Sequence, residues 1–135
     1  MRILDTIRDE RLSMSFEVFP PKTDAAFEEV LQATEAIAAL KPSFISVTYG
    51  AGGKGGKYTM EIARRLQNAD GVETLAHLTC VGAAKEEVRA YLQAMKDAGI
   101  RNIMALRGDL PEGMTPEDMI ARADEALYEI KRNRR

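Results

Sequence analysis

The chain has 135 residues, 45% of them hydrophobic and 30% charged, a balance typical of one globular domain rather than of a disordered chain. Its formal net charge of -2 and its pI near 5.5 leave no basic surplus for neutralising phosphates, so we expect no nucleic-acid partner. With a single cysteine and a single histidine, it cannot form an intramolecular disulfide or a zinc site built from Cys and His alone, and we expect no metal.

The amino-terminal segment is charged from its first residues and lacks the apolar core of a signal peptide. Residues 3–8 predict a short leading helix. No later run approaches the roughly 18 apolar residues that a membrane span needs. We therefore expect a cytoplasmic protein with no membrane contact.

Four short runs of apolar or alternating residues follow, and they predict four strands. The runs begin about 28 to 30 residues apart, which is the length of a βα unit. A helix is therefore expected after each strand. The strands are predicted at 14–19, 44–49, 73–80 and 102–106.

Apolar residues at helical spacing predict the first two of those helices. The first covers 27–38, with Thr23 or Asp24 as its cap and Pro42 beyond its end. The second covers 59–68. Its inward residues are Ile62, Ala63 and Leu66.

The third and fourth helices are marked by their ends as well as by their apolar stripes. Gly99 is placed to be the left-handed cap that ends the third helix. Thr115 caps the fourth, with Pro116 at its first position and Asp118 near the position that closes a capping box. The stripes consist of Val88, Tyr91, Leu92 and Met95 in the third helix and of Met119, Ala123, Leu127 and Ile130 in the fourth.

Strict alternation of strands and helices implies a parallel sheet with right-handed crossovers. The sheet is either open and doubly wound, as in flavodoxin-like folds, or part of a TIM (βα)8 barrel. Ser15, Glu17 and Phe19 share one side of the first strand, and His77 and Thr79 share one side of the third. A strand covered by helices on both faces would be apolar on both. The partly polar face favours the barrel, whose active site lies at the carboxyl ends of its strands.

The length limits how much of a barrel this chain can supply. A full barrel takes about 250 residues, so we expect 1–135 to form a single domain, half of a barrel with four βα units. Its two edge strands would be open to pairing. We therefore expect a homodimer, or a pairing with a complementing half-barrel.

Glu17 stands inside the first strand between aromatic residues, in the segment SFEVFPPK at 15–22. Partial burial raises the pKa of a carboxyl group and makes it a usable proton donor. Alternatively, the carboxylate pairs with a neighbouring Lys or Arg, or lies on a solvated edge. The pattern leaves both interpretations open.

The loop at 48–57 is rich in glycine and joins the second strand to its helix. Such loops allow backbone N–H groups to approach a phosphate. It is not a P-loop, because Ala51 and Tyr58 stand where that motif needs Gly and Ser or Thr, and it lacks the Rossmann spacing. A ligand-binding loop and a solvated loop both remain open.

His77 is the only histidine of the chain, and it stands in the third strand. A lone histidine in a strand is either a hydrogen-bonded structural residue or part of a site. Thr79 and Cys80 follow it without a base–nucleophile pairing. We interpret Cys80 as a small buried residue.

Leu106, Arg107, Gly108 and Asp109 leave the carboxyl end of the fourth strand. Arg107 and Asp109 either pair with each other, with Gly108 in the turn, or belong to a functional site. The pattern leaves both interpretations open.

Taken together, these motifs resemble the methylenetetrahydrofolate reductase family, flavin enzymes of one-carbon metabolism. The matching segments are SFEVFPPK at 15–22, LKPSFISVTYGAGG at 40–53, AHLTC at 76–80 and ALRGDLP at 105–111. Their order and spacing also fit, and the resemblance covers essentially 1–115. It implies a TIM barrel that holds FAD at the carboxyl ends of its strands. It also implies hydride transfer from NADH or NADPH to FAD and then to 5,10-methylenetetrahydrofolate, giving 5-methyltetrahydrofolate.

The resemblance also implies roles for single residues. Glu17 matches the family's acid, which is expected to assist opening of the methylene bridge to the reactive iminium. Asp109 matches the aspartate near flavin and pterin, which tunes the ring and binds folate. Flavin contacts are implied for Thr48, Tyr49, His77, Leu106, Arg107, Gly108 and Asp109, and folate contacts for Glu17, Thr48 and Asp109.

The family's barrel has four more βα units than this chain supplies. The chain therefore resembles the first half of the enzyme. The alternative function is that of a non-catalytic half-barrel scaffold or assembly module that retains the motifs.

Overall fold

A computed structural model describes the fold of this chain. It covers residues 2–9, 12–49, 56–109, 112–118 and 120–121. Within them, four strands form one parallel sheet in the order β1-β2-β3-β4. All four predicted strands are confirmed. Their bounds are β1 (Ser15–Val18), β2 (Phe44–Val47), β3 (Thr74–Thr79) and β4 (Asn102–Leu106).

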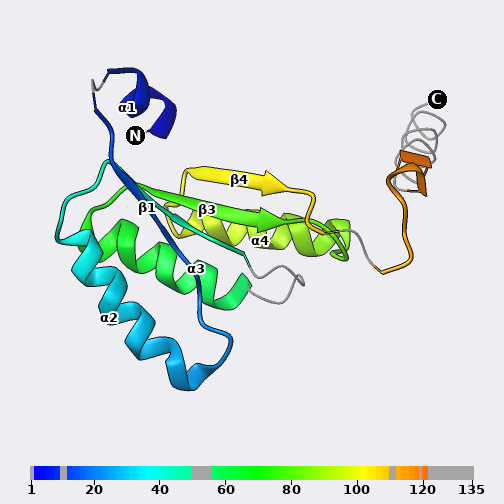
Figure 1. Cartoon of the computed structure of the whole chain (residues 1–135), viewed down its shortest axis with the longest axis horizontal. Coiled ribbons are helices and arrows are strands. Elements are labelled where there is room, and N and C mark those ends of the chain that lie inside the picture. Colours follow the sequence, from blue (N-terminus) through cyan, green and yellow to red (C-terminus); the bar gives the residue numbers. More distant parts are fainter. Residues whose placement is uncertain (1, 10–11, 50–55, 110–111, 119, 122–135) are drawn as a thin grey trace.

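Three helices cover one face of the sheet, as Figure 1 shows. They are α2 (Phe27–Ala38), α3 (Gly56–Arg65) and α4 (Lys85–Asp97). A sequential strand order with the helices on one face is the arrangement of half a TIM barrel. A flavodoxin-like sheet would place β1 inside the sheet and helices on both faces. The half-barrel is therefore confirmed, and the doubly wound alternative is wrong.

The predicted leading helix is α1 (Ile3–Asp9), and it lies at the amino ends of the strands (Figure 1). The backbone N–H of Ile3 donates to Oδ1 of Asn102, the first residue of β4, over 3.0 Å. Asn102 in turn donates through Nδ2 to Oε2 of Glu73 over 3.1 Å. These contacts fix α1 at the end of the sheet opposite to the expected site.

The hydrophobic core fills the space between the sheet and the helices. Ile45, Val47 and Ala76 contribute from the strands and are fully buried. The predicted inward residues of α3 and its extension, Ile62, Ala63 and Leu66, are fully buried as well. In α4, Met95 is fully buried, whereas Leu92 of the same predicted stripe is 38% exposed.

The helix α3 begins earlier than its sequence pattern predicts. Its first residue is Gly56, and a π-helical turn (Leu66–Asp70) follows its end at Arg65. A Cβ atom on Gly56 would lie 2.8 Å from the hydroxyl oxygen of Tyr49 and 3.0 Å from a ring carbon of Tyr91. Only glycine allows the helix to begin this close to two aromatic side chains.

The predicted cap of α2 is wrong. Thr23 has the extended backbone of a cap residue before a 3₁₀ turn (Asp24–Ala26), but its side chain makes no capping hydrogen bond. The carboxylate of Asp24 accepts hydrogen bonds from the Tyr58 hydroxyl and the Lys57 ammonium instead. These two bonds hold the pKa of Asp24 below its ordinary value.

Two other predicted helix ends are confirmed. Gly99 adopts a φ of +80° after α4, the left-handed conformation of a helix cap. The backbone N–H of Asp118 donates to Oγ1 of Thr115 over 3.2 Å, and the Thr115 N–H donates to the Asp118 carboxylate over 2.8 Å, which completes a capping box. The later stripe residues of that helix lie outside the described residues; they are Met119, Ala123, Leu127 and Ile130.

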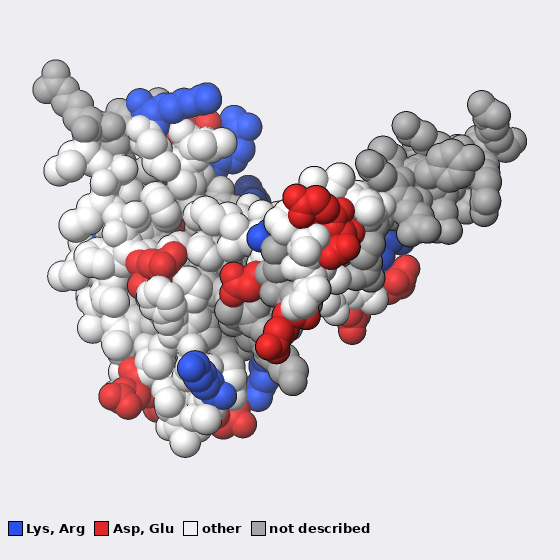
Figure 2. All heavy atoms as spheres, turned by 45° about the vertical axis from the view of Figure 1, so that its right-hand side comes forward, with Lys and Arg blue, Asp and Glu red and all other residues white. Residues whose placement is uncertain are grey.

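The surface carries charges of both signs. On the face shown in Figure 2, uncharged atoms make up most of the left-hand part of the molecule, and Lys, Arg, Asp and Glu side chains are scattered around them. In the part of the chain that the structure describes, no helix is both long and apolar enough to cross a membrane.

Candidate functional site

The face of the sheet that the helices leave uncovered carries the candidate site. Successive side chains of a strand point to opposite faces. Since Val18, Ile45, Val47 and Ala76 belong to the core under the helices, their strand neighbours point to the other face, which we call the open face. Its residues are Ser15, Glu17, Phe44, Ser46, Leu75, His77, Thr79, Asn102, Met104 and Leu106.

Three polar side chains meet on the open face, one from each of three neighbouring strands. Glu17 of β1 is the register partner of Ser46 in β2. The Ser46 hydroxyl lies 3.4 Å from Oε2 of Glu17 and 3.4 Å from the backbone oxygen of Phe16. Nε2 of His77 in β3 lies 3.9 Å from the same Oε2. We call Glu17, Ser46 and His77 the polar row.

Burial differs sharply along the polar row. The side chain of His77 is 10% exposed and that of Glu17 is 47% exposed. Nε2 of His77 is buried and has no hydrogen-bond partner among the described residues. Leaving a buried polar atom unsatisfied costs about 1–3 kcal/mol. His77 therefore contributes a buried polar atom without a hydrogen bond to the polar row, and Glu17 contributes a half-exposed carboxylate on the open face.

The position of Glu17 settles one alternative that its sequence pattern left open. Among the described residues, no Lys or Arg pairs with Glu17, and its side chain is 47% exposed on β1, an edge strand, as the solvated-edge alternative predicts. The carboxylate lies on the open face beside an imidazole, away from the helical layer.

Asp109 lies just beyond the carboxyl end of β4 and is exposed. Arg107 does not pair with it: the Arg107 Nε donates to the carbonyl of Gly108 over 3.1 Å. The Val81 N–H donates to the Arg107 carbonyl over 2.8 Å, which continues the pairing of the two chains past the strand ends. By strand register Glu17 lies level with Asn102, the first residue of β4, whereas Asp109 follows the carboxyl end of β4.

Gly108 packs tightly on the chain that follows β3. Its φ is +92°, and a Cβ atom there would lie 2.5 Å from Cγ2 of Thr79 and 2.5 Å from Cγ1 of Val81. Leu106, two residues earlier, lies on the open face and is 38% exposed. Gly108 therefore holds the segment with Asp109 against the end of β3.

Thr48 and Tyr49 follow β2 and make contacts with different parts of the fold. Thr48 donates its N–H to the Val18 carbonyl over 3.0 Å, and its own carbonyl accepts the hydroxyl of Thr59 over 2.8 Å. The Tyr49 ring packs edge-on against Tyr91 of α4, with 5.6 Å between the ring centroids. Burial raises the pKa of Tyr49, with smaller effects from its neighbours. The Tyr49 side chain thus lies on the helical side, apart from the polar row.

The Tyr91 hydroxyl ties α4 to the start of α3. It donates to the Gly56 carbonyl over 2.9 Å in a partly buried position, and burial raises the Tyr91 pKa. We expect Tyr91→Phe to lower the free energy of unfolding by about 0.5–1.5 kcal/mol, because the hydrogen bond from its hydroxyl to the Gly56 carbonyl is lost. The matched control is Tyr58→Phe, whose hydroxyl bonds Asp24 at an exposed position. Urea unfolding midpoints measure both changes; an equal or larger loss in Tyr58→Phe would contradict this role of Tyr91.

Cys80 is exposed, so its interpretation as a buried residue is wrong. It follows the last residue of β3, Thr79, and stands beyond the packed layer between sheet and helices. Its Sγ lies 3.9 Å from the Leu78 carbonyl. In the described residues, no group of three or more His, Cys, Asp or Glu side chains is placed to hold a metal ion.

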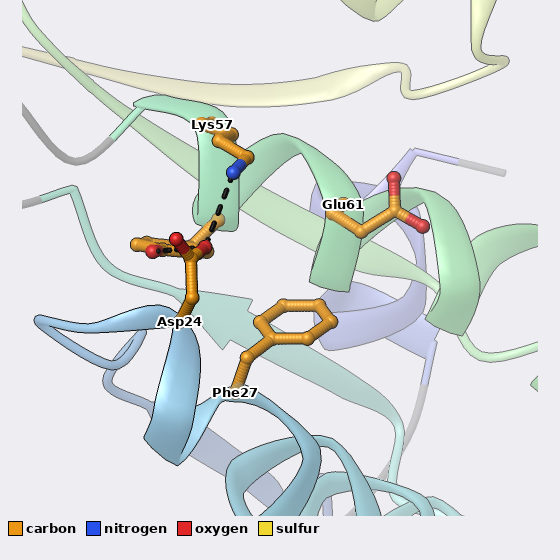
Figure 3. A pocket seen from close by; sticks show the side chains of 5 residues that line it. Asp24, Phe27, Lys57 and Glu61 are labelled. Carbon is orange, nitrogen blue, oxygen red and sulfur yellow. Dashed lines mark hydrogen bonds and ion pairs between the residues drawn. The ribbon is translucent and has the colours of Figure 1, made fainter.

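A cavity of about 410 Å³ lies on the helical side, between the starts of α2 and α3 (Figure 3). Asp24, Phe27, Lys57, Tyr58 and Glu61 line it. Its charged groups already pair: Lys57 lies 3.2 Å from Asp24, and Glu61 lies 2.6 Å from Arg64. The cavity therefore offers no free charge to a ligand, and it lies away from the polar row.

Sequence reasoning missed Ser46. The alternation of the strand does place Ser46 on the same side of β2 as Phe44 and Thr48. What was missing is the register that places it directly beside Glu17. The glycine-rich segment at 50–55 lies outside the described residues.

Comparison with known proteins identifies relatives for nearly the whole chain. The sequence model of methylenetetrahydrofolate reductase matches residues 2–133. A methylenetetrahydrofolate reductase (NADH) 1 of Zea mays is 44% identical over 112 residues, which are 83% of this chain and 19% of that protein. The 5,10-methylenetetrahydrofolate reductases of Pectobacterium carotovorum subsp. carotovorum and Escherichia coli (strain K12) are 40% and 38% identical over 111 residues. Those 111 residues are 82% of this chain and 37% and 38% of the two bacterial proteins, so the chain spans less than two fifths of these relatives' length.

Proposed function

Because the chain belongs to the methylenetetrahydrofolate reductase family, we propose that it supplies the first half of a reductase barrel. In that barrel it would reduce 5,10-methylenetetrahydrofolate to 5-methyltetrahydrofolate with NADH or NADPH. The single observation that carries this proposal is the polar row: a half-exposed carboxylate on the open face, with a buried imidazole beside it.

We assign the acid of the reaction to Glu17. Its Oε2 faces Ser46 and His77, which leaves Oε1 to meet a substrate over the open face. A protonated carboxyl there can donate its proton to the folate nitrogen that leaves the methylene bridge. A general acid in this position contributes typically about 10²- to 10⁴-fold to a rate.

The cofactor of the proposal is FAD, and the residues present suit such a group. The unpartnered Nε2 of His77 is a hydrogen-bonding atom at the open face. Bound FAD supplies hydride transfer between nicotinamide and folate. Around it we place Thr48, His77, Leu106, Arg107, Gly108 and Asp109. Tyr49 joins them through its backbone only, because its ring packs against Tyr91.

Asp109 completes the proposed site from β4, which is the edge strand opposite to β1 and Glu17. Its carboxylate is exposed and follows the turn that Gly108 holds against β3. A negative charge beside a flavin and a pterin changes the electrostatics of both rings. We therefore assign Asp109, with Thr48, to contact with the folate as well as with the flavin.

The proposed partner is a second half-barrel, either another copy or a complementing chain. The open face exposes apolar side chains, among them Met104 at 39% and Leu106 at 38%, and β1 and β4 are edge strands. A two-fold axis along the barrel would bring β4 of one copy beside β1 of the other while keeping all strands parallel. Such a pairing would cover the open face and remove both edges.

One experiment tests cofactor and partner together. We expect the chain mixed with excess FAD to sediment as a dimer that carries flavin absorbance. Leu106→Lys on the open face is expected to weaken the dimer, because closure would bury the added charge. Leu92→Lys, on α4 and equally 38% exposed, is the matched control and is expected to change nothing.

The outcomes separate the two functions. A dimer that gains no flavin absorbance would contradict the enzyme and favour the non-catalytic scaffold. A monomer at high micromolar concentration would contradict the pairing.

A further inference from the structure

We propose that Ser46 is a positioning residue that holds the carboxylate of Glu17 in place beside His77. The inference rests on the proposed role of Glu17 as the acid. It concerns a residue that neither the resemblance nor the sequence pattern assigns to the site.

The position of Ser46 between two strands carries the proposal. Its side chain projects from β2 toward β1, and its hydroxyl lies within 3.4 Å of two acceptors, Oε2 of Glu17 and the Phe16 carbonyl. A serine hydroxyl has one proton to donate. The Ser46 hydroxyl can therefore donate either to the Glu17 carboxylate or to the Phe16 carbonyl. No other described side chain donates a hydrogen bond to Glu17.

Burial gives this contact its importance. Ser46 is 8% exposed, whereas the Glu17 side chain is 47% exposed. Water competes little for the serine hydroxyl but freely for the outer carboxylate oxygen. Without the hydroxyl, Glu17 would gain access to rotamers that turn into solvent, and its contact with His77 would be lost.

The arrangement divides the two oxygens of Glu17 between two tasks. Oε2 is oriented inward, 3.4 Å from the Ser46 hydroxyl and 3.9 Å from Nε2 of His77. Oε1 is then the oxygen left to a substrate. Ser46 acts through Glu17, and it needs no contact with the substrate to affect the proton transfer.

His77 supplies a direct readout, because it is the only histidine of the chain. Its ring gives one imidazole signal in NMR spectra of the chain. We expect Glu17→Gln to shift that signal. We expect Ser46→Ala to shift it in the same direction, since the carboxylate leaves the imidazole in both. The double variant is expected to shift it no further than Glu17→Gln alone, because the two residues act as one unit.

Two further variants separate positioning from folding. Ser46→Thr keeps a hydroxyl on a residue type that strands favour, and its imidazole signal is expected at the parent position. Ser43→Ala removes a hydroxyl at the amino end of the same strand, where Ser43 Oγ accepts the Met14 N–H, and is expected to leave the signal in place. Should Ser46→Ala not fold, Ser46→Cys, of similar size and with a weak donor, takes its place.

The proposal is overturned if Ser46→Ala leaves the imidazole signal unshifted, or if Ser46→Thr shifts it as far as Ser46→Ala. This readout uses neither flavin nor folate, so a chain that binds no FAD would contradict the proposed function and not the role of Ser46. In a flavin-loaded protein, Ser46→Ala is expected to slow folate reduction about tenfold with flavin reduction unchanged. Equal slowing of both half-reactions would also overturn the proposal.

Discussion

Glu17→Gln is expected to slow reduction of the folate by about 10²- to 10⁴-fold and to leave reduction of the flavin by the nicotinamide unchanged. Glutamine has nearly the shape of glutamate and can keep its contact with Ser46, but it has no acidic proton. Only the folate step needs that proton. Stopped-flow absorbance of the flavin measures the two half-reactions separately in the flavin-loaded protein.

The matched control for Glu17→Gln is Glu28→Gln. Glu28 is exposed on α2, on the helical side of the sheet, and the variant removes one carboxylate without touching the open face. Both half-reactions are expected to keep their rates. Equal slowing of both half-reactions by Glu17→Gln would show that the residue supports the site as a whole and is not its acid.

Gly108→Ala is expected to lower the free energy of unfolding by about 2–5 kcal/mol. Two physical effects combine there. A left-handed φ of +92° is unfavourable for alanine, and the added Cβ would lie 2.5 Å from Thr79 and Val81 side chains. Urea unfolding of the two chains measures the loss from the change in midpoint at constant slope.

Gly82→Ala separates the two effects. Gly82 has a φ of +74°, but a Cβ atom there would meet nothing within 4 Å. Only the backbone cost of about 1–2 kcal/mol is therefore expected for it. If both variants lower the free energy of unfolding by the same amount, the close packing of Gly108 on the end of β3 does not contribute to the stability of the chain.

The local elements of this protein follow from its sequence because they depend on periodicity. Alternation predicts the strands, and β4 has the predicted bounds of Asn102–Leu106. Helical spacing predicts the buried residues Ile62 and Leu66. Their regular βα order, with a partly polar strand face, favours a half-barrel over a doubly wound sheet, and the structure confirms it. The same parity places Glu17 and His77 on one face of the sheet.

Contacts between strands follow from the register, which no local pattern specifies. A slip of one residue would turn Ser46 to the helical side, and only the assembled sheet places it opposite Glu17. The predicted cap of α2 is wrong for a similar reason, because no local pattern specifies a distant contact. The carboxylate of Asp24 accepts a hydrogen bond from Tyr58, 34 residues further along the chain, and does not cap α2.

The sequence by itself therefore indicated the family through four short motifs in a fixed order, and it determined the βα order and the face that carries Glu17, because these two depend on periodicity along the chain. Only the tertiary structure decided which side chains meet on that face. It brings Ser46 and His77 to Glu17, and it turns the Tyr49 ring toward Tyr91. The physical reason is that these contacts join residues about 30 or more positions apart, whose distances are set by strand pairing and helix packing together.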